Sequence, residues 1–213
     1  GTDHTNVLID AGISGKRVME GLHAIDRDPK ELDAILITHE HSDHIKGLGV
    51  LARKYGIPVY STQGTIQTML EQNMLGKVDS SLFHTVAPDI RFEIGELAVL
   101  PFRVSHDAAE PVAYRFSYGE KSVAVATDLG YYDDYIVDHL RGLDAVLIES
   151  NHDINMLQVG SDPYYLKQRI LGRKGHLSND NAGRLLGEIL NDRMKAVMLG
   201  HLSRENNYEA LAM

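Results

Sequence analysis

The stretch THEHSDH, residues 38–44, places three histidines and an aspartate within seven positions of a 213-residue chain that has eleven histidines in all. The apolar stretch DAILI (33–37) precedes it and is typical of a buried strand. IKGLGVLARKYGIP (45–58) follows, with apolar residues at helical spacing, and predicts a helix from about Asp43. The histidines therefore lie where a core strand ends and a helix begins, a position that folds hold rigidly and use for chemistry. These surroundings argue against a tag or a low-complexity tract.

Composition limits the class of protein. With 43% hydrophobic residues the chain can bury one substantial core or two small ones, and we predict a single domain over residues 1–213. No apolar run reaches the roughly 18 residues of a membrane helix, and no export signal opens the sequence. We therefore predict a soluble, cytoplasmic protein with no membrane partner. Because cysteine is absent, a metal would be bound by imidazole and carboxylate rather than by thiolate.

Charge is spread unevenly along the chain. The formal charge of −9 argues against a protein that coats nucleic acid through its overall field. The stretch YYLKQRILGRKGHLSN (164–179), however, contains no acid and four basic residues, namely Lys167, Arg169, Arg173 and Lys174. This stretch is either a local phosphate-binding patch or a solvated helix face. Tyr164 and Tyr165 at its start would stack on a frayed base in the first case and pack in the second.

Alternating apolar patterns predict an α/β protein. Strands are expected within residues 6–12, 33–37, 58–62, 90–107, 111–128, 144–150 and 195–201. Helices are expected at residues 16–25, from about 43, at 65–74 and 131–142, and from a cap at Ser178 or Asn179. We expect an αββα four-layer sandwich, in which two mixed β-sheets lie face to face with the helices outside.

Acidic and imidazole side chains recur where these strand patterns end. The residues at such ends are Asp10, His39, His106, Asp128 and His201. Loops after strand ends are common places for sites in α/β folds, so these side chains can converge. In an extended segment His39 and His41 point the same way and can bind one ion. Asp43 and His44 begin the following helix, where they can face a second ion.

The motifs of this sequence resemble those of a known family. THEHSDH resembles the His-x-His-x-Asp-His signature of the metallo-β-lactamase superfamily, and LIDAG (8–12), SHD (105–107), ATDLG (126–130) and LGHLS (199–203) follow the order of its other motifs. The resemblance implies one ion on His39, His41 and His106, a second on Asp43, His44 and His201, and Asp128 as a bridge. It also implies that Asp10 braces the histidine loop without binding an ion.

A finer resemblance concerns LIESNHD (147–153), GRKGHLSNDNAG (172–183) and LGHLSRENN (199–207), which are similar to the YycJ branch of the superfamily. It implies a 5′ to 3′ exonuclease acting on double-stranded DNA. In related RNA-processing nucleases a Gly-His-Ser/Thr helix start supplies a further active-site histidine, and His176 matches it here. Glu149 is the natural partner to orient His176. Members of this branch extend beyond both ends of the present sequence, so we expect both ends to be incomplete.

The implied chemistry needs two divalent ions, Zn, Mn or Fe, which neutralise a phosphodiester and make a nucleophile of water. Asp43, His176 and Glu149 would then be the catalytic residues. Arg204, three residues after His201, would bind a substrate phosphate, together with the basic residues of 164–179. Two alternatives stay open: a hydrolase of thioesters or lactones, and a non-catalytic partner in a cell-wall signalling system. The role of His152 and a homo-oligomeric state also stay open.

Overall fold

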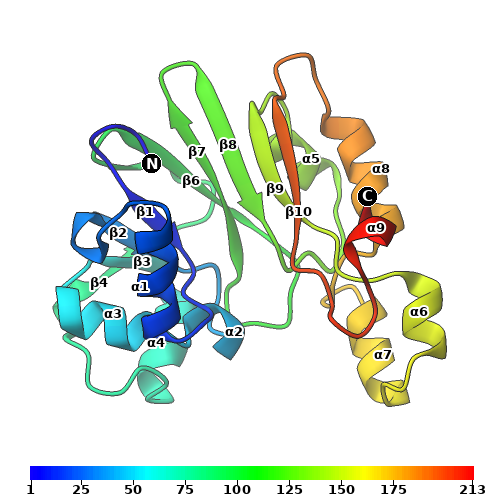
Figure 1. Cartoon of the computed structure of the whole chain (residues 1–213), viewed down its shortest axis with the longest axis horizontal. Helices are drawn as coiled ribbons and strands as arrows, with labels where there is room; N and C mark the ends of the chain where they lie inside the picture. Colours follow the sequence, from blue (N-terminus) through cyan, green and yellow to red (C-terminus); the bar gives the residue numbers. More distant parts are fainter. The chain divides into compact units, whose positions relative to one another are not determined.

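The computed structural model describes all residues 1–213 and divides the chain into two compact units (Figure 1). Unit 1 comprises residues 1–101 and 108–112, and unit 2 comprises residues 102–107 and 113–213. Each unit has its own hydrophobic core, which is the second arrangement that the composition allows. The single domain therefore stays a prediction. No helix has the length and apolar character required to span a membrane.

Unit 1 is built on a four-stranded sheet with the order β1-β2-β3-β4. The strands are β1 (Val7–Ile9), β2 (Ala34–Leu36), β3 (Val59–Thr62) and β4 (Phe83–Val86). Helices α1 (Gly15–Ala24), α3 (Leu48–Tyr55) and α4 (Gln63–Glu71) pack on it through one apolar cluster that includes Ile35, Val59, Leu51 and Ile66. Short helical segments η1 (Pro29–Glu31), α2 (Ser42–Ile45) and η2 (Ser80–Leu82) complete the crossovers.

The first sheet differs in one detail from the expected mixed sheet. All its neighbouring strands are parallel, because each strand is followed by a crossover segment that carries the chain back before the next strand. The antiparallel hairpin of β5 (Phe92–Ile94) and β6 (Leu97–Arg103) follows it along the chain. The boundary between the two units falls within β6.

Unit 2 contains the strands β7 (Val112–Tyr118, of which Val112 belongs to unit 1), β8 (Lys121–Ala126), β9 (Ala145–Glu149) and β10 (Ala196–Gly200), in the order β10-β9-β8-β7. The β7–β8 pair is antiparallel and the other pairs are parallel, so this sheet is mixed as predicted. Helices α5 (Asp134–Leu140) and α8 (Asn179–Ile189) cover it with residues such as Leu140 and Leu185. The remaining helices are α6 (Ile154–Val159), α7 (Tyr164–Leu171) and α9 (Glu209–Ala212). The predicted α/β class with two helix-flanked sheets is confirmed.

Strand registers explain why polar residues collect at one edge of each sheet. In unit 2 Ala126 pairs with Ile148 and Gly200 pairs with Glu149, so β8, β9 and β10 end side by side. In unit 1 Ile9 pairs with Leu36, so β1 and β2 also end together. The residues that follow these ends therefore lie close to one another within their own unit, as the strand-end pattern predicts.

Candidate functional site

The histidine loop of unit 1 connects β2 to α2. Its rings cluster: the ring centroid of His39 lies 4.6 Å from that of His41 and 4.0 Å from that of His44. His39 and His44 are buried, whereas the side chain of Asp43 is 67% exposed. His41 is the N-cap residue of α2, and Asp43 and His44 lie in its single turn. A side chain at Gly12 would collide with the carbonyl of Asp43, so glycine lets β1 approach this loop closely.

Asp10, after β1, holds this loop in place. Its Oδ1 accepts a hydrogen bond from the Thr38 amide, and its Oδ2 accepts one from Thr38 Oγ1, each at 2.8 Å. Oδ2 also lies 2.7 Å from His44 Nδ1. Because Thr38 Oγ1 donates to Asp10, it accepts from His39 Nδ1 at 3.0 Å. One carboxylate therefore orients two histidine rings, directly for His44 and through Thr38 for His39.

Unit 2 gathers its histidines around Asp128. Asp128 Oδ1 lies 3.5 Å from His106 Nε2 and 3.6 Å from His201 Nε2, and its side chain is 2% exposed. Donors that share one ion at bond lengths of about 2.0–2.2 Å lie roughly 3.3–3.6 Å apart in a tetrahedral site. These separations are too long for hydrogen bonds and close to those of shared metal ligands.

Glu149 lies behind this group and is completely buried. Its Oε1 is 2.8 Å from both His176 Nδ1 and His201 Nδ1, and its Oε2 accepts hydrogen bonds from the amides of Leu129 and Leu177. Burial by itself would raise the pKa of Glu149, but the hydrogen bonds from the two histidines outweigh it and lower the pKa to about 2. Glu149 is thus a carboxylate whose two oxygens are both engaged, which suits it to position histidines rather than to bind an ion.

Together these contacts set the tautomers of four rings. His44 and His201 donate from Nδ1 to a carboxylate, His39 donates to Thr38, and His106 Nδ1 donates to the carbonyl of Gly175 at 3.0 Å. In each neutral ring the lone pair is then on Nε2, the atom that would bind a metal. Burial lowers the pKa of His106, against the attraction of Asp128, and so favours its neutral form. The donor set therefore fits a divalent metal ion.

Three of these residues have an unusual backbone. Asp10, Asp128 and His201 adopt left-handed φ angles of 57°, 59° and 57°. Each follows the end of a strand, and non-glycine residues in this region cost on the order of 1–3 kcal/mol and collect at functional sites. Asn151 supports one of them, because its Nδ2 donates to the carbonyl of His201 at 2.9 Å. Sequence patterns gave no sign of this geometry.

The loop that carries His176 is tied to the loops of His106 and Asp128. Ser105 Oγ donates to the carbonyl of Arg173 at 2.7 Å, and the amide of Gly130 donates to the carbonyl of Ser105 at 2.8 Å. A side chain at Gly175 would collide with the carbonyl of Ile170, so glycine is required where this loop folds back on α7. Ser178 then caps α8 by accepting from the amide of Asn181, which confirms the predicted helix start.

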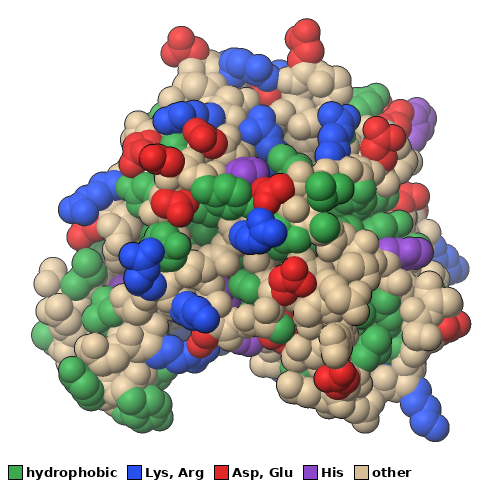
Figure 2. All heavy atoms as spheres, turned by 180° about the vertical axis from the view of Figure 1, so that it is seen from behind, with side chains coloured by type: hydrophobic (Ala, Val, Ile, Leu, Met, Phe, Trp, Pro, Cys, Tyr) green, Lys and Arg blue, Asp and Glu red, His purple; other side chains and the backbone are tan.

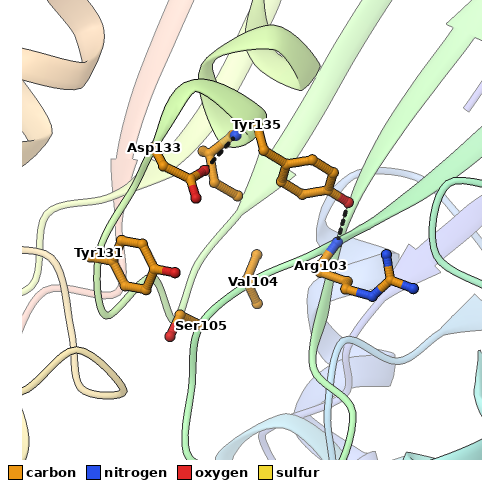
Figure 3. Close-up of a pocket in the computed structure, with 7 residues that line it drawn as sticks. Arg103, Val104, Ser105, Tyr131, Asp133 and Tyr135 are labelled. Carbon is orange, nitrogen blue, oxygen red and sulfur yellow. Dashed lines mark hydrogen bonds between the residues drawn. The ribbon is translucent and has the colours of Figure 1, made fainter.

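The loops that carry His106 and Asp128 line a pocket of about 420 Å³ in unit 2, which the sequence did not predict (Figure 3). In Figure 3 the hydroxyl of Tyr135 accepts a hydrogen bond from the amide of Arg103, and Asp133 accepts one from the first turn of α5. Ser105 is adjacent to His106, and Tyr131 lies three residues after Asp128. The pocket has the size of a small-molecule site and shares two loops with the candidate ligands.

Two of the predicted substrate-binding residues are engaged in holding α7. Lys167 Nζ donates to the carbonyls of Gln158 and Gly160, at 2.8 and 2.7 Å, and closes the turn between α6 and α7. Arg169 Nε donates to Asp107 Oδ2 at 2.5 Å. These contacts are intramolecular, so the sequence prediction of phosphate binding overlooked a structural use of both side chains.

The other predicted substrate-binding residues are exposed. Lys174 and Arg204 face solvent, and the guanidinium of Arg173 lies over the ring of Tyr131, 3.9 Å from its centroid. Basic and acidic side chains intermingle on the face drawn in Figure 2. His152, whose role the sequence left open, is buried in unit 2, and burial lowers its pKa below the ordinary value. It is therefore an interior residue rather than a surface loop histidine.

Comparisons with known proteins identify the family. The Beta-lactamase superfamily domain matches residues 5–201. Exodeoxyribonuclease WalJ of Streptococcus pneumoniae serotype 2 (strain D39 / NCTC 7466) is 47% identical over 99% of this chain and 78% of its own length. Exodeoxyribonuclease YycJ of Bacillus anthracis is 41% identical over 100% of this chain and 80% of its own length.

A solved structure agrees with the fold. The metallo-beta-lactamase fold protein YhfI from Bacillus subtilis superimposes with a TM-score of 0.69, covering 96% of this chain and 76% of its own, at 21% identity. The predicted fold is therefore confirmed over nearly the whole chain. The chain belongs to the metallo-β-lactamase superfamily, and within it to the group that contains WalJ and YycJ.

Proposed function

We propose that the protein is a metal-dependent exodeoxyribonuclease that digests one strand of duplex DNA, in the 5′ to 3′ direction. The observation that carries this proposal is sequence similarity. The chain is 47% and 41% identical to two exodeoxyribonucleases over 99% and 100% of its length. Of the catalytic residues that the sequence predicts, Glu149 and His176 are in hydrogen-bond contact, as a positioned acid requires.

Two divalent ions would be bound by seven residues. We assign His39, His41 and His106 to the first ion, Asp43, His44 and His201 to the second, and Asp128 to both. The hydrogen bonds at Nδ1 of four histidines support this assignment, because they leave Nε2 as the ligand atom. Imidazole and carboxylate suit Zn²⁺, Mn²⁺ and Fe²⁺ alike. Such ions, when bound, neutralise the phosphodiester charge and lower the pKa of water.

The proton for the leaving group would come from His176, with Glu149 as its positioning partner. Glu149 accepts from His176 Nδ1, which fixes the ring and directs Nε2 away from the carboxylate. From Nε2 the ring would give a proton to the leaving 3′ oxygen, as a general acid. Glu149 itself is already ionised and engaged by four donors, so its part is to position His176 and His201.

Substrate phosphates would be held by exposed basic residues near these loops. Lys174 is two residues before His176, and Arg204 is three residues after His201. Arg173 would add positive charge beside Tyr131. Lys167 would contribute through its charge, since its ammonium already donates to two carbonyls, and Arg169 would contribute less because Asp107 pairs with its guanidinium.

The test is a comparison of substrates. Purified protein with Mn²⁺ is incubated with end-labelled duplex DNA and, separately, with a generic thioester. We expect mononucleotides to be released from the labelled 5′ end while the thioester stays intact. Thioester hydrolysis without release of nucleotides would assign the protein to the small-molecule hydrolases of this fold. If the protein binds metal but hydrolyses neither substrate, a role as a non-catalytic partner is favoured.

A further inference from the structure

Unit 2 carries an exposed group of hydrophobic side chains on α6 and α7. Val159, Tyr164 and Tyr165 are 86%, 76% and 75% exposed, more than any other large hydrophobic side chain except the terminal Met213. Figure 2 shows hydrophobic side chains gathered at the end of the arm that α6 and α7 form, at the lower left of the view. The two tyrosines are therefore not packing residues. Their exposure argues against the packing interpretation that the sequence left open.

The arm, defined here as residues 154–175, is held firmly to unit 2. Leu157 is fully buried, and Asp162 accepts a hydrogen bond from Asn206 Nδ2 at 2.8 Å. Lys167 fastens the turn before α7, and Arg169 pairs with Asp107 beside His106. An ordered helix thus presents the tyrosines to solvent. Tyrosine has few rotatable bonds, so such a side chain binds a partner at a small entropic cost.

The charge beside the tyrosines comes from two basic residues, of which Arg169 is paired with Asp107 and Lys167 has no acidic partner. On a helix, residues three and four positions apart lie on one face, which places Lys167 beside Tyr164 and Arg169 beside Tyr165. No acidic residue occurs from Tyr164 to Asn179, and Lys167 bonds only to uncharged carbonyls. Aromatic rings with cations one turn away are what proteins use to bind unpaired nucleic acid, through base stacking and phosphate attraction.

We propose that Tyr164 and Tyr165 stack on unpaired bases of the strand that digestion leaves behind. This inference rests on the proposed function, because an enzyme that removes one strand of a duplex always leaves the complementary strand single-stranded. The eight residues of α7 span about 12 Å, so the tyrosines are separated from the His176 loop by roughly three to four nucleotides at about 3.4 Å each. The contact therefore needs an unpaired tail of at least that length.

The experiment varies the tail and the tyrosines together. Steady-state KM and kcat are measured with Mn²⁺ on duplexes whose undigested strand has an unpaired tail of about two or about eight nucleotides. We expect the wild type to have the lower KM for the longer tail. In the double variant Tyr164→Ala/Tyr165→Ala that advantage should disappear, with KM rising about 5-fold or more and kcat unchanged. Hydrolysis of bis-p-nitrophenyl phosphate should not change.

Two control proteins keep the test specific. Tyr164→Trp/Tyr165→Trp retains aromatic rings and should keep the preference for the long tail. Tyr118→Ala removes a tyrosine that is 49% exposed at the end of β7 and should behave as the wild type. The double alanine variant replaces only exposed side chains, and its circular dichroism spectrum should match that of the wild type.

Other results would overturn the inference. An unchanged tail preference in the double alanine variant would do so while leaving the exonuclease proposal intact. If the wild type hydrolyses bis-p-nitrophenyl phosphate but no DNA, the proposed function fails and this inference fails with it. If sedimentation shows that the double variant loses a dimer while its KM is unchanged, the patch binds a second copy of the chain instead.

Discussion

The two units carry their candidate ligands in contrasting ways. In unit 1 all four are in one stretch of six residues, His39 to His44, and a single strand end places them. In unit 2 His106, Asp128 and His201 come from three distant loops, and His176 comes from a fourth. The first set is a motif that can be recognised in a sequence. In the second set, Asp128 and His201 lie together because parallel strands β8, β9 and β10 end at one edge of a sheet, and His106 reaches Asp128 from the loop after β6.

The carboxylates that position the histidines, Asp10 in unit 1 and Glu149 in unit 2, also differ. Asp10 is partly exposed, follows β1 and orients rings of the histidine loop that follows the neighbouring strand β2. Glu149 has no exposed surface and joins the His176 loop, the His201 loop and the Leu129 amide through four hydrogen bonds. The dispersed ligands of unit 2 therefore depend on one fully buried carboxylate that joins several loops, whereas the histidine loop of unit 1 depends on one partly exposed carboxylate that holds a single loop. Substitutions can test this difference.

The largest effect is expected from the two aspartates that we propose as metal ligands. Asp43→Ala should lower hydrolysis by about 10³-fold or more, because it removes a ligand for an ion that stabilises transition-state charge. Its side chain is 67% exposed, so the free energy of unfolding should change by no more than about 0.5 kcal/mol. Asp128→Ala should lose as much activity but also destabilise the protein by about 1 kcal/mol, since alanine is strained at its φ of 59°.

Activity assays at saturating metal and urea unfolding of both variants check this. Retained activity in Asp43→Ala would count against a two-metal mechanism. Equal losses of stability in the two variants would remove the contrast between the exposed and the buried ligand.

His176→Ala should have the next largest effect, and only on demanding substrates. Cleavage of DNA should slow by about 10²- to 10⁴-fold, the usual contribution of a positioned general acid, while metal content stays the same. Bis-p-nitrophenyl phosphate has an activated leaving group and needs little protonation, so its hydrolysis should change far less. If both substrates lose activity equally, or neither does, His176 is a structural or binding residue.

A smaller effect is expected at the positioning carboxylates. Asp10→Asn should weaken metal binding by about 10- to 100-fold, and excess metal should restore activity on both substrates. Glu149→Gln should weaken metal binding similarly, yet leave DNA cleavage impaired when metal is restored, because Glu149 also orients His176. Metal titrations with activity on DNA and on bis-p-nitrophenyl phosphate measure this. Full recovery of Glu149→Gln would show that its contact with His176 has no role in the reaction.

The smallest effect concerns two lysines of the basic stretch. Lys174→Ala should weaken duplex binding a few-fold and reduce the salt slope of the affinity by about 1, as expected for one phosphate contact. Lys167 already donates to two carbonyls, so Lys167→Ala should lower stability by about 1 kcal/mol and change the slope less. Salt titrations of DNA binding separate the two. A larger slope change for Lys167→Ala would reverse these roles.

Much of the fold was predictable from local patterns. The apolar runs gave β1 to β3 and β5 to β10, and capping residues gave α8. β4 was missed, because its FHTV sequence has two exposed positions at its centre and no apolar alternation. The helix after the histidine loop was predicted as continuous, but it is broken into α2 and α3 at Lys46 and Gly47.

The candidate site was predictable where the type and sequence position of a residue indicate its role. The metal ligands followed from strand-end positions and the family resemblance, and they stay a prediction. The pairing of Glu149 with His176 was predicted, but its second contact, with His201, was not, because that contact depends on segments that meet only in the folded unit. The left-handed backbone of Asp128 and His201 and the pocket beside Tyr131 also arise from long-range packing.

The central claim is that the local ligands of unit 1 and the dispersed ligands of unit 2 hold the same two ions. Anomalous diffraction from crystals of the Mn²⁺-loaded protein tests it directly. We predict two metal peaks, one bound by His39, His41 and His106, the other by Asp43, His44 and His201, with Asp128 bound to both. A single peak, or peaks whose ligands all come from one unit, would contradict the account.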